Sequence, residues 1–428
     1  MKVLPAKFLK GEINLPGDKS ITHRAIIFAS LSEGKCLIEN MGLGEDNKST
    51  INVFRNLGAK ISRIKSKCII EGVGIRGLKE PSCVLDAGNS GTTIRIATGI
   101  LSAQNFFSVI SGDKYLVKRP MKRIIEPLSM MGAQIIGRNN NSFPPLAIIG
   151  NEKLRGINYS LKIASAQVKS SILMAGMYAE GETIVTEPAK SRDHTERLME
   201  HLGIPIKVID KTIKISPVDK IPSFRLVVPG DISSAAFFIV AATLLKDSFV
   251  IIKNVSLNDT RTGIIDVLTN MGANIKIANK RNECGEPVGD IVVNGVDTLK
   301  PFVIKGDIIP RVIDEIPILA VAGSFANGVS IIDNAEELRV KESDRIKSMI
   351  EGLRSSGVHV EELPAGMVIH GKRSFKYGKV KTFGDHRIAM AFYVFGICSD
   401  KGLELDDVSS VKISFPDFFK IMESLINA

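Results

Sequence analysis

NVFRNLGAKI, residues 52–61, combines an amphipathic helical pattern with a closing glycine and a short alternating strand, and its recurrence decides the fold. Glycine suits the end of a helix because it adopts the left-handed conformation at little cost. The closing glycines of the five copies are separated by 74, 71, 69 and 85 residues, and FPDFFKIMESLINA (415–428) resembles a sixth such helix. A period of about 70 residues indicates an internal repeat of six units. The other copies are EPLSMMGAQII (126–136), RLMEHLGIPIKV (197–208), DVLTNMGANIKI (266–277) and MIEGLRSSGVHVE (349–361).

A second helix precedes this pattern in each unit and follows a short polar loop. Asp, Asn and Ser in these loops suit helix N-caps, because their side chains accept hydrogen bonds from free backbone amides. Apolar segments such as KCLIENM (35–41) and SFVIIKNV (248–255) then predict strands. Each unit therefore reads as strand, helix, strand, helix, strand in an alternating α/β arrangement. The six loops are PGDKS (16–20), AGNSG (87–91), IASAQ (163–167), PGDIS (229–233), VIDEIP (312–317) and FGDHR (383–387).

The two Pro-Gly-Asp turns divide the chain into halves. LPGDKSITHR (15–24) and VPGDISSAAF (228–237) share the turn, but the second copy lacks the basic residues of the first. This repetition predicts two similar domains of three units each, joined near residue 229. The helix AAFFIVAATLL (235–245) is apolar nearly all round, so we expect it to lie inside its domain, encircled by sheet. The alternative is a generic doubly wound sheet, which the repeat makes less attractive because no Rossmann fingerprint opens either half.

Composition narrows the classes of protein. The 428 residues carry 44% hydrophobic and 24% charged residues, as in globular proteins, and no apolar run approaches the roughly 20 residues of a membrane span. Five scattered cysteines without a C-x-x-C pair, and no signal peptide, predict a reducing compartment, the cytoplasm. The absence of H-E-x-x-H and of a dense His/Cys cluster predicts no metal. The net charge of +10 favours anionic ligands. Without Trp, a basic tail or an RNA-binding motif, small anions are favoured over nucleic acid or a membrane surface.

Several loops of the first half carry cations next to a predicted helix start. In GDKSITHR (17–24), Lys19, Ser20 and Arg24 fall in the first two helical turns, where free amides and the helix dipole favour phosphate. A Walker A loop is excluded, because Asp18 stands where that motif needs glycine. GNSGTTIR (88–95) lets backbone amides approach an anion. Arg119 precedes Pro120, expected at the first helical position, and Arg192 occupies the equivalent place in the next unit.

The second half adds charged groups whose roles the residues alone leave open. Asp314 and Glu315 border a strongly apolar helix, where a carboxylate is either an N-cap or a base. The segment RVKESDR (339–345) is of a kind that is more often a salt-bridged helix start at the surface than a functional site. His386 in GDHR (384–387) is a single histidine of the kind that is more often structural. Together the two halves predict an enzyme whose cationic loops face a cleft between the domains and bind two small anions.

These motifs closely resemble the 5-enolpyruvylshikimate-3-phosphate (EPSP) synthase family, whose stretches match in order over nearly the whole chain. They are LPGDKSITHR, GNSGTTIR, KRPM, SAQVKSS, SRDHTE, PRVIDEIPILAVA, ELRVKESDR, GDHRIAM and SFPDF. SAQ and ELRVKESDR are similar to the bacterial class that tolerates glyphosate. The resemblance implies an inverted α/β barrel in each of two domains, each barrel made of three βαβαββ units. The domains would be 16–228 and 1–15 plus 229–428, with the active site in the cleft. A monomer without metal or organic cofactor is expected.

The resemblance also implies the reaction, in which the enolpyruvyl group of phosphoenolpyruvate moves to the 5-hydroxyl of shikimate 3-phosphate and phosphate leaves. Asp314 would take the hydroxyl proton, Glu342 with Lys19 would transfer the methylene proton, and His386 would assist. Shikimate 3-phosphate would be bound by Lys19, Ser20, Arg24, Ser165, Gln167, Arg192, Asp314 and Lys341. Phosphoenolpyruvate would be bound by Lys19, Gly91, Arg119, Gln167, Arg345 and Arg387.

Two positions qualify the resemblance. Ser414 stands where many family members have Lys before FPD, and Lys412 would lie on the other side of a strand. Gly91 stands where glyphosate-insensitive members often carry Ala, so we expect competitive inhibition by glyphosate. A UDP-N-acetylglucosamine enolpyruvyl transferase shares the fold but usually has a reactive Cys near Arg119, whereas no cysteine lies between Cys83 and Cys284. The other alternative is a non-enzymatic RNA-binding protein, which predicts steeply salt-dependent RNA binding.

Overall fold

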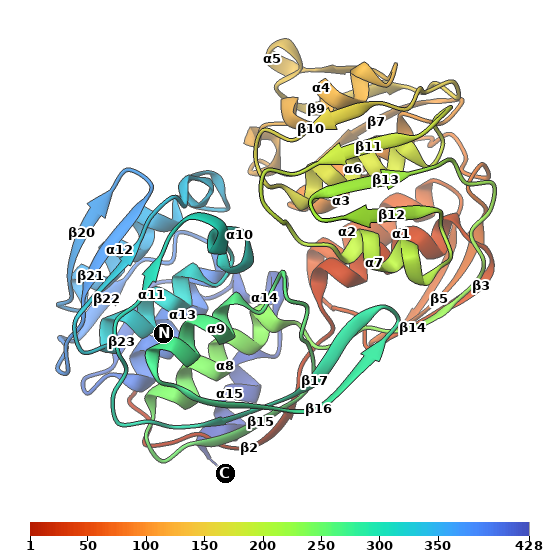
Figure 1. The fold of residues 1–428 in the computed structure, drawn as a ribbon. Helices are drawn as coiled ribbons and strands as arrows, with labels where there is room; N and C mark the ends of the chain where they lie inside the picture. Colours follow the sequence, from red (N-terminus) through yellow and green to blue (C-terminus); the bar gives the residue numbers. More distant parts are fainter. Residues whose placement is uncertain (428) are drawn as a thin grey trace. The chain divides into compact units, whose positions relative to one another are not determined.

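The computed structural model describes residues 1–427, which form two compact units, each with its own hydrophobic core (Figure 1). Unit 1 comprises Met1–Pro16, Pro229–Arg281 and Pro287–Ala428, and unit 2 comprises Gly17–Val228 with Asn282–Glu286. The chain thus enters unit 1, leaves it after residue 16 and returns at residue 229. No helix among residues 1–427 combines the length and hydropathy needed to cross a membrane.

Unit 2 contains three four-stranded sheets. Its strands are β3 (Glu33–Glu39), β4 (Lys60–Ile64), β5 (Lys67–Val73), β6 (Leu85–Asp86), β7 (Phe107–Ser111), β8 (Gln134–Gly137), β9 (Phe143–Ile149), β10 (Asn158–Ser160), β11 (Thr183–Thr186), β12 (Ile206–Ile209), β13 (Thr212–Ile215) and β14 (Arg225–Val227). Its helices are α1 (Lys19–Leu31), α2 (Glu45–Asn56), α3 (Gly91–Leu101), α4 (Lys122–Met130), α5 (Arg138–Asn141), α6 (Ala166–Gly176), α7 (His194–His201) and the 3-10 helix η1 (Leu116–Lys118). The sheet orders are β14-β3-β5-β4, β6-β7-β9-β8 and β10-β11-β13-β12.

Unit 1 contains two four-stranded sheets and one three-stranded sheet. Its strands are β1 (Lys2–Val3), β2 (Lys10–Asn14), β15 (Phe249–Ser256), β16 (Asn274–Glu283), β17 (Glu286–Asn294), β18 (Val303–Ile304), β19 (Val329–Ile332), β20 (His359–Leu363), β21 (Gly366–His370), β22 (Gly378–Val380) and β23 (Leu403–Leu405). Its helices are α8 (Ile232–Leu244), α9 (Gly263–Met271), α10 (Ile309–Val312), α11 (Ile316–Phe325), α12 (Arg345–Ser355), α13 (His386–Cys398), α14 (Val411–Ser414) and α15 (Phe418–Ile426), with 3-10 helices η2 (Gly306–Ile308) and η3 (Glu336–Val340). The sheet orders are β16-β17-β15-β2, β18-β19-β21-β20 and β1-β23-β22.

The five four-stranded sheets repeat one strand order, and the sixth sheet, β1-β23-β22, has three strands. In β6-β7-β9-β8 the first pair is parallel and the other two pairs are antiparallel, as a βαβαββ unit requires. Two of the four-stranded sheets are completed by a strand from a distant part of the chain: β2 pairs in parallel with β15, and β14 pairs in parallel with β3. Each exchanged strand is followed directly by one of the two Pro-Gly-Asp turns. In unit 1, α8, α11 and α13 contact one another inside the sheets, as Figure 1 shows.

The local expectations about the helices are largely confirmed. The five closing glycines all have positive φ, between 72° and 103°. Asp18 accepts the amide of Ile21 at 2.9 Å and Asp231 that of Ser233 at 2.8 Å, so both Pro-Gly-Asp turns cap their helices. Gly17 is required by a close approach, because a Cβ there would lie 1.8 Å from the Asn40 carbonyl oxygen. The helix at 235–245 is buried within unit 1 as expected.

Two local expectations are wrong. Pro120 is not the first residue of a helix: α4 begins at Lys122 with Met121 as its N-cap residue, and the amide of Met121 donates to the Ser142 carbonyl at 2.8 Å. Lys412 lies in α14 and not in a strand. Val411 and Phe415, one helical turn apart, are both buried, whereas Ile413, which a strand would place on the same face, is only half-buried. Lys412 and Ser414 therefore lie in one helical turn and not in a strand.

Candidate active site

In unit 2, the start of α1 brings together Lys19, Ser20 and Arg24, as the sequence predicted. Lys19 Nζ lies 3.1 Å from Asp46 Oδ2. The Arg24 guanidinium is buried and donates to Ser20 O at 3.0 Å, to Thr195 Oγ1 at 2.6 Å and to Ser170 Oγ at 2.8 Å. Burial lowers the pKa of Arg24 to about 10, so the side chain remains a cation at neutral pH. The result is a fixed positive charge beside a helix N-terminus, an arrangement that binds phosphate.

A second group lies at the starts of α3 and α6 in the same unit. Gln167 Nε2 donates to Thr92 Oγ1 at 2.9 Å, and its carbonyl accepts from Arg95. Arg119 donates to Asn89, so its guanidinium also lies at the start of α3. A Cβ built on Gly91 would lie 3.0 Å from Arg95 Nη1 and 3.3 Å from Arg119 Nη1. Gly91 therefore has two guanidinium groups beside it, and Ser165 occupies the N-cap position of α6.

A buried ionic network supports Arg192, which precedes α7. Lys169 Nζ lies 2.8 Å from Glu187 and 2.6 Å from Glu196, and all three side chains are almost fully buried. Although burial opposes the charge, the two carboxylates raise the pKa of Lys169. Glu187 also accepts from the amide of Ser191 at 3.2 Å, next to Arg192. The network thus fixes the loop that carries Arg192, and Arg192 is near enough to Arg24 to act on its pKa.

His23, between these groups, is fully buried and kept neutral. Its Nδ1 pairs with Thr50 Oγ1 at 2.6 Å, and Thr50 pairs with Thr93 at 2.7 Å. Burial lowers the pKa of His23 from 6.5 to about 3. Hydrogen bonds from His23 through Thr50 to Thr93 therefore link α1, α2 and α3.

His23 predicts a loss of stability in mild acid. The unfolded chain takes up a proton at His23 below about pH 6.5, whereas the folded chain does so only near pH 3, so acid favours unfolding. Between pH 6.5 and 5 we expect this residue to cost about 2 kcal/mol of unfolding free energy. His23→Asn should reduce the pH dependence by that amount in urea unfolding. The exposed His201→Asn variant is the control. An unchanged slope in His23→Asn would contradict the prediction.

In unit 1, the site is built around the buried guanidinium of Arg345. Its Nε lies 2.8 Å from Asp385 Oδ2, its Nη2 lies 2.5 Å from Glu342 Oε2, and its Nη1 lies 3.4 Å from Asp314 Oδ1. Burial works against its charge, but the carboxylates of Asp385, Glu342 and Asp314 outweigh it and raise the pKa of Arg345. Arg345 in turn lowers the pKa of Asp385, which burial alone would raise. Four residues from three segments are therefore fixed in one charged cluster.

Asp314 has cations on three sides. Besides Arg345, Arg387 Nη2 lies 3.8 Å and Lys341 Nζ 4.0 Å from its carboxylate, and Arg387 Nη1 donates to the Asp314 backbone carbonyl at 2.9 Å. Burial lowers the pKa of the Lys341 amine, although 29% of its side chain remains exposed. His386, the first residue of α13, lies near enough to Asp385 to lower the pKa of that carboxyl. The predicted residues of unit 1 thus meet at the starts of α11, α12 and α13.

Glu315 resolves one open choice of the sequence analysis. Its side chain is buried and accepts from Ser233, and Arg261 Nη2 donates to the same hydroxyl at 2.6 Å. Glu315 is therefore held in the core of unit 1, next to Arg387 at 3.9 Å, whereas the Asp314 side chain is 13% exposed. Of the two carboxylates, Asp314 is the one placed among the site cations with a surface open to a reactant.

Sequence reasoning missed the residues that hold the predicted ones in place. Asp385 was considered only as a cap, although it also pairs with Arg345, 40 residues away. The remaining missed residues are Asp46, Arg95, Lys169, Glu187, Thr195 and Glu196. The only sequence signal was local: Arg95 and Lys169 lie inside the matched motifs GNSGTTIR and SAQVKSS, at positions that a buried helix would normally give to apolar residues.

Comparison with known proteins identifies the family. The family model described as EPSP synthase (3-phosphoshikimate 1-carboxyvinyltransferase) matches residues 3–422. The 3-phosphoshikimate 1-carboxyvinyltransferase of Thermodesulfovibrio yellowstonii is 50% identical over 422 residues, 98% of each chain. That of Citrifermentans bemidjiense is 47% identical over 99% of this chain and 98% of its own. A solved EPSP synthase from Acinetobacter baumannii superposes with a TM-score of 0.89 at 42% identity, covering 99% of this chain and 97% of its own, which confirms the predicted architecture. The chain therefore belongs to the EPSP synthase family, the 3-phosphoshikimate 1-carboxyvinyltransferases.

Proposed function

We propose that the charged groups of both units act on one pair of substrates, phosphoenolpyruvate and shikimate 3-phosphate. The chain is an enolpyruvyl transferase of the shikimate pathway, as its family membership establishes. The roles of individual residues are our proposal. The observation that carries it is the Asp314 carboxylate, held among Arg345, Arg387 and Lys341 and still exposed at its surface. An accessible carboxylate placed among cations that bind anions is the side chain that can accept a proton from a bound hydroxyl group.

Shikimate 3-phosphate is assigned to the groups around Arg24. Its phosphate is held by Ser165, Gln167, Arg192, Lys19, Ser20 and Arg24, while Lys341 and Asp314 contact the ring hydroxyls. The support is the fixed position of Arg24, whose guanidinium makes three hydrogen bonds to the protein. A preorganised guanidinium loses little freedom when it binds phosphate.

Phosphoenolpyruvate is assigned to the guanidinium groups beside Gly91 and Asp314. Lys19, the amide of Gly91, Arg119 and Gln167 bind it from unit 2, and Arg345 and Arg387 bind it from unit 1. The absence of a side chain at Gly91 lets the guanidinium groups of Arg95 and Arg119 lie close to its backbone, 3.0 and 3.3 Å from the place that a Cβ would take. Since Ser414 stands where many relatives have lysine, we propose that Arg345 and Arg387 provide the cationic charge in its place.

The proposed mechanism is an addition followed by an elimination. Asp314 takes the proton of the 5-hydroxyl group of shikimate 3-phosphate while the oxygen of that hydroxyl group bonds to the enol carbon of phosphoenolpyruvate. The methylene carbon gains a proton from Glu342, assisted by Lys19. In the tetrahedral intermediate the methyl group then returns a proton to Glu342, the double bond reforms, the C–O bond to phosphate breaks, and the proton held by Asp314 passes to the leaving phosphate. Fixed cations stabilise the phosphate oxygens as charge develops. His386 supports Asp385, which holds Arg345 in place.

The test of this assignment is phosphate release by the purified enzyme in the presence of each substrate alone and of both together. Release only with both substrates is expected. UDP-N-acetylglucosamine in place of shikimate 3-phosphate should give no turnover. Release from phosphoenolpyruvate alone would contradict the proposed addition step.

We also propose that the enzyme acts as a cytoplasmic monomer without a nucleic-acid partner, on the basis of its free cysteines and its small-anion groups. Light scattering and salt-dependent RNA titration test these two points.

Gly91 predicts the response to glyphosate. We expect millimolar glyphosate to inhibit the enzyme competitively with phosphoenolpyruvate. Gly91→Ala should weaken this inhibition by about tenfold or more, because the added methyl lies 3.0 Å from Arg95 Nη1 and 3.3 Å from Arg119 Nη1. The inhibition constant and the KM for each substrate provide the measurement. The KM for shikimate 3-phosphate should stay unchanged. Equal inhibition of both enzymes would contradict the placement of the inhibitor beside Gly91.

A further inference from the structure

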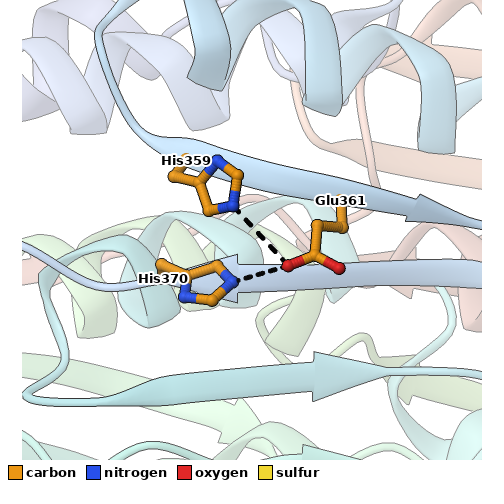
Figure 2. Close-up of side chains that lie close together, drawn as sticks. All are labelled: His359, Glu361 and His370. Carbon is orange, nitrogen blue, oxygen red and sulfur yellow. Dashed lines mark hydrogen bonds and ion pairs between the residues drawn. The ribbon is translucent and has the colours of Figure 1, made fainter.

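Three metal-ligating side chains meet on the outer face of the β18-β19-β21-β20 sheet in unit 1 (Figure 2). Along β20, Val360 is buried while His359 and Glu361 are exposed, as the alternation of a strand requires. In the antiparallel register His359 lies directly opposite His370 of β21. The two imidazoles therefore face the solvent side by side, with the carboxylate of Glu361 next to both.

The distances suit one small cation. His370 Nε2 lies 2.9 Å and His359 Nε2 3.6 Å from the same oxygen of Glu361, and the ring centroids of the two histidines are 4.5 Å apart. All three ligand atoms lie within 4.8 Å of one another. Ligands bound tetrahedrally at about 2.0–2.1 Å from zinc are about 3.3–3.4 Å from each other, so small side-chain rotations satisfy the geometry.

The donor set selects the class of metal. Two imidazoles with one carboxylate favour a borderline divalent ion such as Zn²⁺ and disfavour Mg²⁺ and Ca²⁺, which take oxygen ligands. The strands of the hairpin are joined by a single two-residue turn, Pro364 and Ala365, so the ligands are held on a rigid element. The exposure of His359 and Glu361, 70% and 56%, leaves the remaining coordination positions to water.

We propose that His359, Glu361 and His370 form a surface site for Zn²⁺ or a chemically similar divalent ion. The sequence predicted no metal because these residues are separated by up to eleven positions, and only the hairpin brings them together. The site is independent of the catalytic proposal. Its sheet packs on α12 beyond the helix start that carries Arg345, and none of its residues belongs to the charged clusters. Bound metal would cross-link β20 and β21 and stabilise this part of unit 1.

The experiment is a titration of the untagged, metal-free enzyme with Zn²⁺ by calorimetry, with Co²⁺ absorption as a reporter of coordination. We expect one ion with a micromolar Kd and a Tm that rises with Zn²⁺. His359→Ala, His370→Ala and Glu361→Gln should each weaken Zn²⁺ binding at least tenfold, since loss of a group that only supports a metal ligand already weakens metal affinity by about tenfold. The kcat measured without metal should stay unchanged.

Two matched variants serve as controls. His201→Ala removes an exposed histidine of unit 2, and Cys83→Ser removes an exposed thiol, and both should bind Zn²⁺ as the parent does. Circular dichroism verifies that each variant is folded. No binding by the parent enzyme, or equal binding by the His359→Ala and His370→Ala variants, would overturn the proposal.

Discussion

Asp314→Asn is expected to reduce kcat by about 10²–10⁴-fold, the usual contribution of a positioned general base. Asparagine has nearly the same shape but cannot accept the 5-hydroxyl proton. The substitution leaves the three cations next to Asp314, at 3.4, 3.8 and 4.0 Å, in the chain. It also leaves the phosphate-binding groups of unit 2 unchanged. The affinity for shikimate 3-phosphate should therefore change much less than kcat. Phosphate release and calorimetric binding measure the two quantities separately.

Asp266→Asn is the matched control for this substitution. Asp266 also pairs with an arginine, Arg311 at 2.6 Å, and lies in the same unit, but its side chain is 49% exposed and outside the charged cluster. We expect that variant to keep full activity. Full activity in Asp314→Asn would instead remove Asp314 as the base and leave Glu342 as the remaining carboxylate with an accessible surface.

The sequence predicted the positions of the helix starts and which of them carry charge. Lys19, Gly91 and Arg345 each begin a helix, and His386 begins another, because short-range signals such as Asp caps and glycine closures operate within one turn. The repeat also predicted the alternation of strands and helices, while the complete βαβαββ unit was implied by the family resemblance. These features depend on residues close together in the sequence, and a pattern can show them.

What the sequence could not show depends on contacts between distant segments. The residue pattern of 10–14 does not indicate that β2 pairs with β15, and only the family resemblance assigned residues 1–15 to the C-terminal domain. The pairing of Lys169 with Glu187 and Glu196, and of Arg345 with Asp385, joins loops and helices whose spacing carries no periodicity. Lys412 was misplaced because a four-residue helix is too short to show a helical period.

Arg345→Met is expected to destabilise unit 1 by about 3–5 kcal/mol as well as to abolish activity. Asp385 is fully buried, and removal of the guanidinium takes away the cation that lies 2.8 Å from its carboxylate. An uncompensated buried charge costs that amount, more than the pair itself contributes. Urea unfolding, with hydrogen exchange of the α12 and α13 amides, measures the loss in unit 1 separately from unit 2.

The pH dependence of this variant separates electrostatics from packing. Although burial would raise the pKa of Asp385, Arg345 lowers it in the folded enzyme. The ion pair therefore stabilises the folded enzyme at pH values above the ordinary pKa of a carboxyl group. This stabilisation is lost as the pH falls through the pKa of Asp385 in the folded state. In Arg345→Met, Asp385 binds its proton more readily. The difference in stability between parent and variant should therefore shrink as the pH is lowered.

The second substitution Asp385→Asn should recover part of the loss. In Arg345→Met/Asp385→Asn neither residue of the pair is charged. We therefore expect the double variant to be less destabilised than the sum of the two single variants, with a coupling free energy of about 0.5–3 kcal/mol. Arg311→Met, at an ion pair with 31% of the arginine exposed, should cost no more than about 1 kcal/mol. If the double variant is as unstable as Arg345→Met, the guanidinium acts through its packing and not through the charge of Asp385. That outcome would remove Asp385 as the residue that positions Arg345 for phosphoenolpyruvate.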